Sequence, residues 1–175
     1  MPMSNIPRRR PSLLKGSLSA AGLLAAALFW SQAGVAQTAG PFAKFDGGWR
    51  GAGYVFGSNG SRERIACRAH YSIPPSGAAV SQSLICASDS YRFEVQSDVV
   101  LLDGHSVKGT WEESTRHAAG DLIGEASDGR FDGTVAGTGF TAEISIRMSG
   151  EKQAVTITPH GSDITKVDIV LARGA

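Results

Sequence analysis

Short segments of alternating polar and apolar residues, separated by turns, fill the chain from Gly48 onward. The turns are rich in Gly, Asn, Asp and Pro and recur at spacings of about 8 to 12 residues, which is typical of all-β domains. Because successive side chains of a strand point to opposite faces, each segment predicts a strand with one buried and one solvated face. The predicted strands are residues 49–56, 62–73, 79–88, 91–102, 106–115, 122–126, 130–136, 140–149, 153–158 and 164–172.

The connections between these strands predict an antiparallel arrangement. No segment has apolar residues at helical spacing for long enough to predict a helix, and parallel strands need long crossover connections. A meander of this kind removes its open edges by closing on itself. We therefore predict an all-β, antiparallel up-and-down β-barrel of about 8–10 strands, in one domain of residues 45–175. A two-sheet β-sandwich is the alternative. A membrane-spanning barrel is disfavoured, because glycines interrupt the apolar face and only 7% of the residues are aromatic.

The first 36 residues have the three parts of an export signal. Basic residues between Arg8 and Lys15 precede an uncharged apolar stretch, residues 18–30, and small residues precede a cleavage site after Ala36. The apolar stretch is shorter than the roughly 20 residues that span a bilayer. We therefore predict a signal peptide at residues 1–36 and a leader segment at residues 37–44. The mature protein is expected in the periplasm or outside the cell, with no membrane span.

The charge of the mature chain excludes one class of partner. The complete sequence has a net charge of +1, but 13 Lys and Arg and 16 Asp and Glu follow residue 36, which leaves −3 after cleavage. Proteins that bind nucleic acid draw most of their affinity from a basic surplus. We therefore expect no nucleic-acid partner.

The two cysteines lie at matching positions of one predicted hairpin. Residues 62–73 and 79–88 flank a Pro-Pro-Ser-Gly turn, and folding the chain about Ser76 and Gly77 places Cys67 opposite Cys86. The same register places Ala69 opposite Leu84 and His70 beside Ser83. An exported protein with two cysteines most simply pairs them in an oxidising compartment. We predict a disulfide bond between Cys67 and Cys86.

One face of each strand combines bulky apolar residues with glycine. In the first strand Trp49, Gly51, Gly53 and Val55 share a face, and later strands repeat this combination at residues 107–111 and 131–135. Alternation of large and small side chains fits the taper of a small barrel, and glycine permits tight coiling of the strands. This face is predicted to point inward and to leave some space there.

The first and the last predicted strand together carry a resemblance to known proteins. Gly47, Gly48 and Trp49 open the first strand, and Arg173 follows the last strand. This combination resembles the calycins, the superfamily of lipocalins, avidins and fatty-acid-binding proteins. This resemblance implies that Arg173 packs across the Trp49 indole as a structural pair at one barrel end. The other lipocalin sequence blocks and the biotin ligands of avidins are missing. The chain, with its WRGxG and ICASDSYRF segments, also resembles a family of small exported alphaproteobacterial proteins, which implies an exported location.

No motif in the sequence indicates catalysis, a metal site or a cofactor. The four histidines lack the spacings that prearrange metal ligands, and no nucleophile elbow or phosphate loop is present. Glu112, Glu113 and Asp121 are expected at the surface. The one cluster with binding potential is a candidate anion-binding face made of Arg62, Arg64, Arg68 and Arg92.

Two hypotheses about function follow. The first is a non-enzymatic periplasmic barrel that binds a small apolar or amphipathic ligand in its interior, as calycins do. The second is a barrel with a filled core that acts on a periplasmic protein partner, as a protease inhibitor, a lysozyme inhibitor or an envelope-integrity factor. The first requires an open interior cavity, and the second requires a packed core and a protruding segment, for which residues 37–44 are the candidate.

Overall fold

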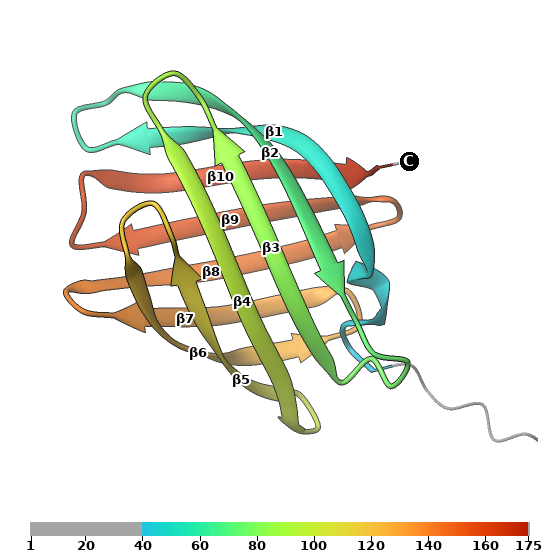
Figure 1. The fold of residues 1–175 in the computed structure, drawn as a ribbon. Coiled ribbons are helices and arrows are strands. Elements are labelled where there is room, and N and C mark those ends of the chain that lie inside the picture. The colour runs from blue at the N-terminus through green and yellow to red at the C-terminus, as the bar shows by residue number, and fades with distance from the viewer. Residues whose placement is uncertain (1–39, 175) are drawn as a thin grey trace, which may run out of the picture. The chain divides into compact units, whose positions relative to one another are not determined.

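The computed structural model describes residues 40–174, which form a closed barrel of ten antiparallel strands (Figure 1). A short 3-10 helix, η1 (Ala43–Phe45), precedes the first strand. The strands are β1 (Gly47–Gly57), β2 (Arg62–Ser72), β3 (Ala79–Ala87), β4 (Arg92–Asp103), β5 (Ser106–Glu113), β6 (Ala118–Ser127), β7 (Arg130–Gly137), β8 (Phe140–Ser149), β9 (Lys152–His160) and β10 (Ile164–Arg173). Each strand pairs with its neighbour in the chain, and β10 pairs with β1 to close the barrel. The predicted up-and-down barrel is confirmed, and the sandwich alternative is wrong.

The hairpin of β2 and β3 has the predicted register. Cys67 lies opposite Cys86, Ala69 opposite Leu84 and His70 opposite Ser83. The two cysteines form a disulfide bond, with their Cα atoms 4.1 Å apart. The predicted disulfide is therefore confirmed, and it is consistent with an oxidising, extracytoplasmic compartment.

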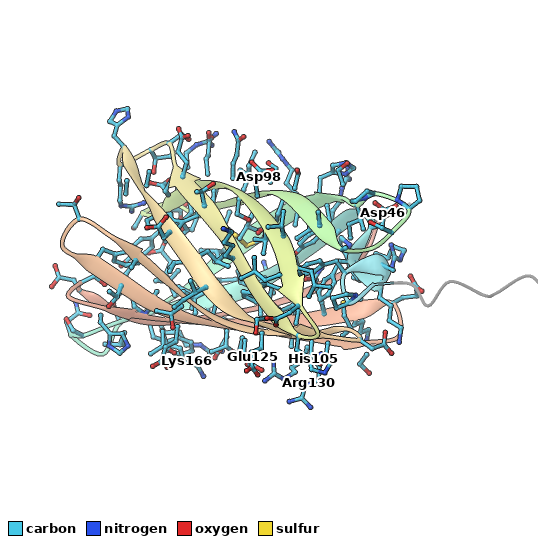
Figure 2. The ribbon with its side chains drawn as sticks, turned by 90° about the horizontal axis from the view of Figure 1, so that it is seen from below. Asp46, Asp98, His105, Glu125, Arg130 and Lys166 are labelled. Carbon is cyan, nitrogen blue, oxygen red and sulfur yellow. A yellow bond between two sulfur atoms is a disulfide. The ribbon has the colours of Figure 1, made fainter. Side chains whose placement is uncertain are left out.

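The strands separate an apolar interior from a charged exterior. Trp49, Val55, Ile65, Ile169 and Leu171 are among the most deeply buried side chains. On the outside, the labelled side chains of Asp98, Glu125, Arg130 and Lys166 point away from the barrel wall (Figure 2). This distribution follows the period-two pattern of the sequence.

One end of the barrel is closed by aromatic side chains. Phe42, Phe45 and Trp49 are all buried there. The Trp49 indole donates a hydrogen bond to the Phe45 carbonyl at 2.7 Å, which fixes η1 across the opening. The Arg173 guanidinium lies 4.4 Å from the centre of the Trp49 ring and donates a hydrogen bond to the Lys44 carbonyl at 2.9 Å. The two residues that the calycin resemblance places together thus lie together at the closed end.

The part of the predicted leader segment that the structure describes is packed against the barrel. The backbone amides of Gly40 and Phe42 donate hydrogen bonds to the carbonyls of Ser76 and Gly77, at 3.0 and 3.2 Å. With Phe42 buried, residues 40–44 act as part of the closed end and do not protrude from it. Residues 1–36, the predicted signal peptide, lie outside the described residues. Within residues 40–174 no helix is long and apolar enough to cross a membrane.

Candidate functional site

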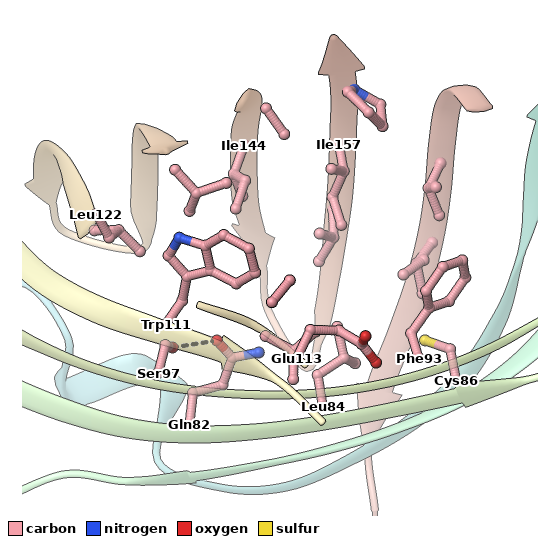
Figure 3. Close-up of a pocket in the computed structure, with 18 of the residues that line it drawn as sticks. Gln82, Leu84, Cys86, Phe93, Ser97, Trp111, Glu113, Leu122, Ile144 and Ile157 are labelled. Atoms are coloured by element: carbon pink, nitrogen blue, oxygen red, sulfur yellow. Dashed lines mark hydrogen bonds between the residues drawn. The ribbon is translucent and has the colours of Figure 1, made fainter. Parts of the chain in front are cut away.

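The barrel encloses a cavity of about 330 Å³ (Figure 3). Its wall is mostly apolar, and it includes Trp111, Phe93, Leu122, Ile144 and Ile157, which come from five different strands. A volume of this size lies at the lower end of the range for small-molecule binding sites, about 300–1,000 Å³.

The number of strands and the size of the inward side chains explain the cavity. A barrel of about eight strands has an interior just wide enough for side chains to fill. Ten strands enclose a wider interior, and apart from Phe140 and Pro159 the residues with which β6 to β9 line it are of small or medium size. These residues are Ala118, Leu122, Val135, Ala142, Ile144, Ile146, Val155 and Ile157. Such side chains are too short to meet across the barrel, so space remains between them.

The cavity has a closed floor and an open mouth. At the floor, towards η1, the Tyr71 hydroxyl donates a hydrogen bond to the Gln153 Oε1 atom at 2.9 Å. Burial raises the pKa of Tyr71, and the hydrogen bond to Gln153 only partly offsets this effect, so the phenol stays neutral. At the opposite end the cavity is lined by Glu113, Arg116 and Ser162, which lie in or beside the turns that leave the barrel open.

One buried polar atom at the floor has no partner. Gln153 is 0% exposed, and its Nε2 atom makes no hydrogen bond within the described residues. Buried amide groups are almost always hydrogen-bonded, because an unpaired donor costs about 1–3 kcal/mol. Gln153 does not itself line the cavity, so this donor is unused but is not part of the cavity wall.

A second polar group lies in the cavity wall. The Ser97 hydroxyl of β4 donates a hydrogen bond to the Gln82 Oε1 atom of β3 at 2.9 Å. The amide of Gln82 faces the cavity (Figure 3), and its Nε2 atom donates no hydrogen bond to another described residue. This amide is a hydrogen-bond donor that a ligand inside the barrel can reach.

At the mouth, Glu113 organises the turn between β5 and β6. Its carboxylate accepts hydrogen bonds from the backbone amides of Glu94, Thr115 and Arg116 at 3.0, 3.2 and 2.8 Å, and from the Thr115 hydroxyl at 2.6 Å. Burial raises the pKa of Glu113, but these hydrogen bonds outweigh it and hold the pKa below its usual value. The carboxylate is thus ionised and fully engaged within the protein.

Arg116 and Phe93 form the rim beside Glu113. The Arg116 guanidinium lies 5.0 Å from the centre of the Phe93 ring, within the range of a cation–π contact. It also lies 3.8 Å from the Glu113 carboxylate. The rim therefore presents an aromatic and cationic surface above an apolar interior.

The structure places the predicted arginine face outside the barrel and divides it. Arg62, Arg64 and Arg68 alternate along the outer face of β2. Arg62 lies 3.5 Å above the Tyr54 ring. Arg92 lies on β4, where it forms an ion pair with Glu94. The four arginines therefore do not converge on one point, and none of them lines the cavity.

Several residues of the cavity were not identified from the sequence. Glu113 was expected at the surface, yet it is only 6% exposed; the alternation that places Val107 and Trp111 inward also places Glu113 inward. Gln82 shares a face with Cys86 in the same way, so the alternation of this strand also indicates an inward position for Gln82. Within residues 40–174, no group of three or more His, Cys, Asp or Glu is arranged to hold a metal ion.

Comparisons with known proteins identify the fold and no more. No family model matches the sequence, and no curated protein matches it. Among solved structures, the chain resembles the S-type phycobiliprotein lyase CPES from Guillardia theta, with a TM-score of 0.57 and 13% sequence identity over 77% of this chain and 90% of that chain. At this identity the likeness shows a shared fold alone.

Proposed function

We propose that this protein is a non-enzymatic barrel that binds a small apolar or amphipathic ligand in its interior, in the periplasm or outside the cell. The observation that carries the proposal is the apolar cavity of about 330 Å³, closed at the Trp49 end and open at the Glu113 end. A preformed apolar cavity with a few polar groups is the usual form of a small-molecule site.

The polar groups around the cavity favour a ligand with one hydrogen-bond acceptor. The free donor of Gln82 lies in the wall, and among the described residues Arg116 at the rim is the only cation that lines the cavity. A ligand with an apolar body and a carbonyl or hydroxyl oxygen satisfies Gln82 without burying a net charge, which is costly when unpaired.

The chemistry of the same groups supports binding over catalysis. The Ser97 hydroxyl is bonded to an amide, which is not a base that removes its proton. The Glu113 carboxylate accepts four hydrogen bonds from its own turn and the adjacent strand, so it is not free to transfer protons to a ligand.

The alternative, a barrel with a filled core that acts on a periplasmic protein, has less support. Its core is expected to be packed, whereas this interior contains a cavity. Its candidate inhibitory segment, residues 37–44, is docked at the closed end over the part that the structure describes.

A pair of matched variants tests the proposal. Ile144→Trp adds an indole inside the cavity, and Ile123→Trp makes the same change on the outer face, where Ile123 is 64% exposed. Fluorescence titration with N-phenyl-1-naphthylamine should give saturable binding to the wild type. Binding should weaken at least tenfold in Ile144→Trp and stay unchanged in Ile123→Trp. Equal affinities of the folded variants would overturn interior binding.

Native mass spectrometry of the protein purified from its own source identifies the ligand. A small-molecule adduct that is lost on denaturation is the expected result. A bare chain that also fails to bind the fluorescent probe would remove the basis of the proposal.

A further inference from the structure

The outer face of β1, β2 and β3 is basic and contains no outward carboxylate. Arg50, Arg62, Arg64 and Arg68 all point outward from β1 and β2. The single acidic residue of these three strands, Glu63, accepts a hydrogen bond from the Ser90 backbone amide at one end of the barrel. The described chain is acidic as a whole, with 13 Lys and Arg against 16 Asp and Glu. This face is therefore a local concentration of positive charge on an acidic protein.

Two of these arginines lie directly opposite each other. Arg50 of β1 pairs in register with Arg68 of β2, and like charges at opposed positions of a sheet destabilise it. Within the described residues neither guanidinium donates a hydrogen bond, and neither lies within 4 Å of a carboxylate. Arg62, in contrast, is occupied by the Tyr54 ring. The Arg50 and Arg68 pair thus has charge and donors that no described residue of the protein uses.

A groove of about 250 Å³ contains this pair. Besides the two arginines, its polar lining residues are His70 and Ser83, and the rest of the lining is Gly48, Trp49, Ala69, Ile85 and Gly174. The two glycines help to keep it open, and a Cβ atom added at Gly48 would meet nothing within 4 Å. The groove lies on the outside of the wall, so it is separate from the interior cavity.

We propose that this groove binds a phosphate group. Two guanidinium groups, an imidazole and a hydroxyl offer more donors than one carboxylate accepts, whereas phosphate carries three strong acceptor oxygens and a charge between −1.5 and −2 near pH 7. Arginine suits this role because its planar donors match phosphate geometry. The bound group also removes the repulsion between Arg50 and Arg68. The proposal is independent of the ligand in the interior.

Titration with inorganic phosphate, followed by the backbone amide NMR shifts, tests the site. We expect saturable shifts at Gly48, Arg68 and His70, and affinity at least tenfold lower in Arg68→Gln, since this variant removes a charged hydrogen-bond donor. Arg62→Gln is the matched control on the same face and should keep wild-type affinity. An equal loss in both variants would show general charge attraction and would overturn the proposal.

A second variant tests the groove by filling it. Gly48→Glu places a carboxylate beside His70 and the arginine pair without a steric clash. Phosphate binding should be lost, while the unfolding temperature should be unchanged or higher. Retained phosphate binding in this folded variant would contradict the site.

The source of the phosphate group is distinguished with vesicles. A lipid headgroup would be indicated if the protein sediments with phosphatidylglycerol vesicles and not with vesicles of phosphatidylcholine alone. Inorganic phosphate should then prevent this sedimentation. Binding of inorganic phosphate without sedimentation would indicate a free phosphate compound. If neither inorganic phosphate nor the vesicles bind, the proposal is wrong.

Discussion

At the scale of single residues, the inward glycines determine how closely neighbouring strands approach. A Cβ atom at Gly51 would lie 2.0 Å from the Val170 carbonyl oxygen, and one at Gly53 would lie 2.0 Å from that of Asp168. Neither glycine lines the cavity. These glycines therefore permit the tight approach of β1 to β10, while the space predicted inside the barrel is present as a cavity lined by other residues.

The first prediction compares two glycines of the same strand. Gly53→Ala forces a Cβ atom against the backbone of β10, so it should lower the free energy of unfolding by about 1–3 kcal/mol. Gly48→Ala meets nothing within 4 Å and should change it by less than about 0.5 kcal/mol. Urea unfolding of the two variants measures both values. Equal effects would show that the crowding at Gly53 is relieved by a small shift.

Glu113 makes stability depend on pH. Its folded pKa is depressed because hydrogen bonds to the carboxylate outweigh burial. The stabilisation is therefore present above the unfolded pKa, near 4.5, and is lost as the pH falls through the lower folded pKa. The turn between β5 and β6 is therefore stabilised above about pH 4.5 and loses this contribution in acid.

The second prediction follows from this dependence. Glu113→Gln should lower the free energy of unfolding by about 1–3 kcal/mol at pH 7, because a charged acceptor is replaced by a neutral amide. At pH 3 the difference from the wild type should shrink, since this pH lies below the unfolded pKa near 4.5, where the stabilisation from the depressed pKa is being lost. Urea unfolding at the two pH values measures it. A difference that is the same at both would mean that the ionised form contributes nothing.

At the scale of elements, the hairpin of β2 and β3 is specified most completely by its own sequence. One register aligns the cysteines, the apolar pair Ala69 and Leu84, and the outward-facing pair His70 and Ser83. A slip by one residue would turn every side chain of one strand to the wrong face. The disulfide fixes this register covalently.

The third prediction concerns that bond. Its cysteines are separated by 19 positions, and closing a loop of about this size should contribute roughly 3 kcal/mol to stability. The double variant Cys67→Ala and Cys86→Ala should therefore have a free energy of unfolding, measured in urea, that is lower by that amount. Reductant should lower the wild type to the level of the variant and leave the variant unaffected. An effect of reductant on the variant would point to a cause other than the disulfide.

At the scale of the whole molecule, the fold was predictable because it is assembled from local hairpins. Every pairing except that of β1 with β10 joins strands adjacent in the chain, so alternation and turn residues indicate nearly the complete topology. The cavity was less accessible. Its existence depends on how wide ten strands close and on how far side chains from opposite walls reach, and no single segment contains that information. The alternation indicates an inner-face position for Gln82 and Glu113, but the cavity that they line follows only from the closed barrel.

Closure of the barrel leads to the last prediction, since Arg173 at the end of β10 contacts the segment that leads into β1. Its guanidinium covers Trp49 and donates hydrogen bonds to the carbonyls of Lys44 and Asp46. Arg173→Gln should lower the free energy of unfolding by about 1–3 kcal/mol.

This loss should be localised at the closed end. Hydrogen exchange of the Phe42 and Phe45 amides, which are bonded to Gly77 and Phe42 carbonyls, should become faster in Arg173→Gln. Exchange in the hairpin of β2 and β3 should change less. Arg130→Gln, at an exposed arginine that donates no hydrogen bond within the described residues, is the control and should alter neither region. Uniformly faster exchange in Arg173→Gln would instead mean that Arg173 stabilises the barrel globally and not the closed end in particular.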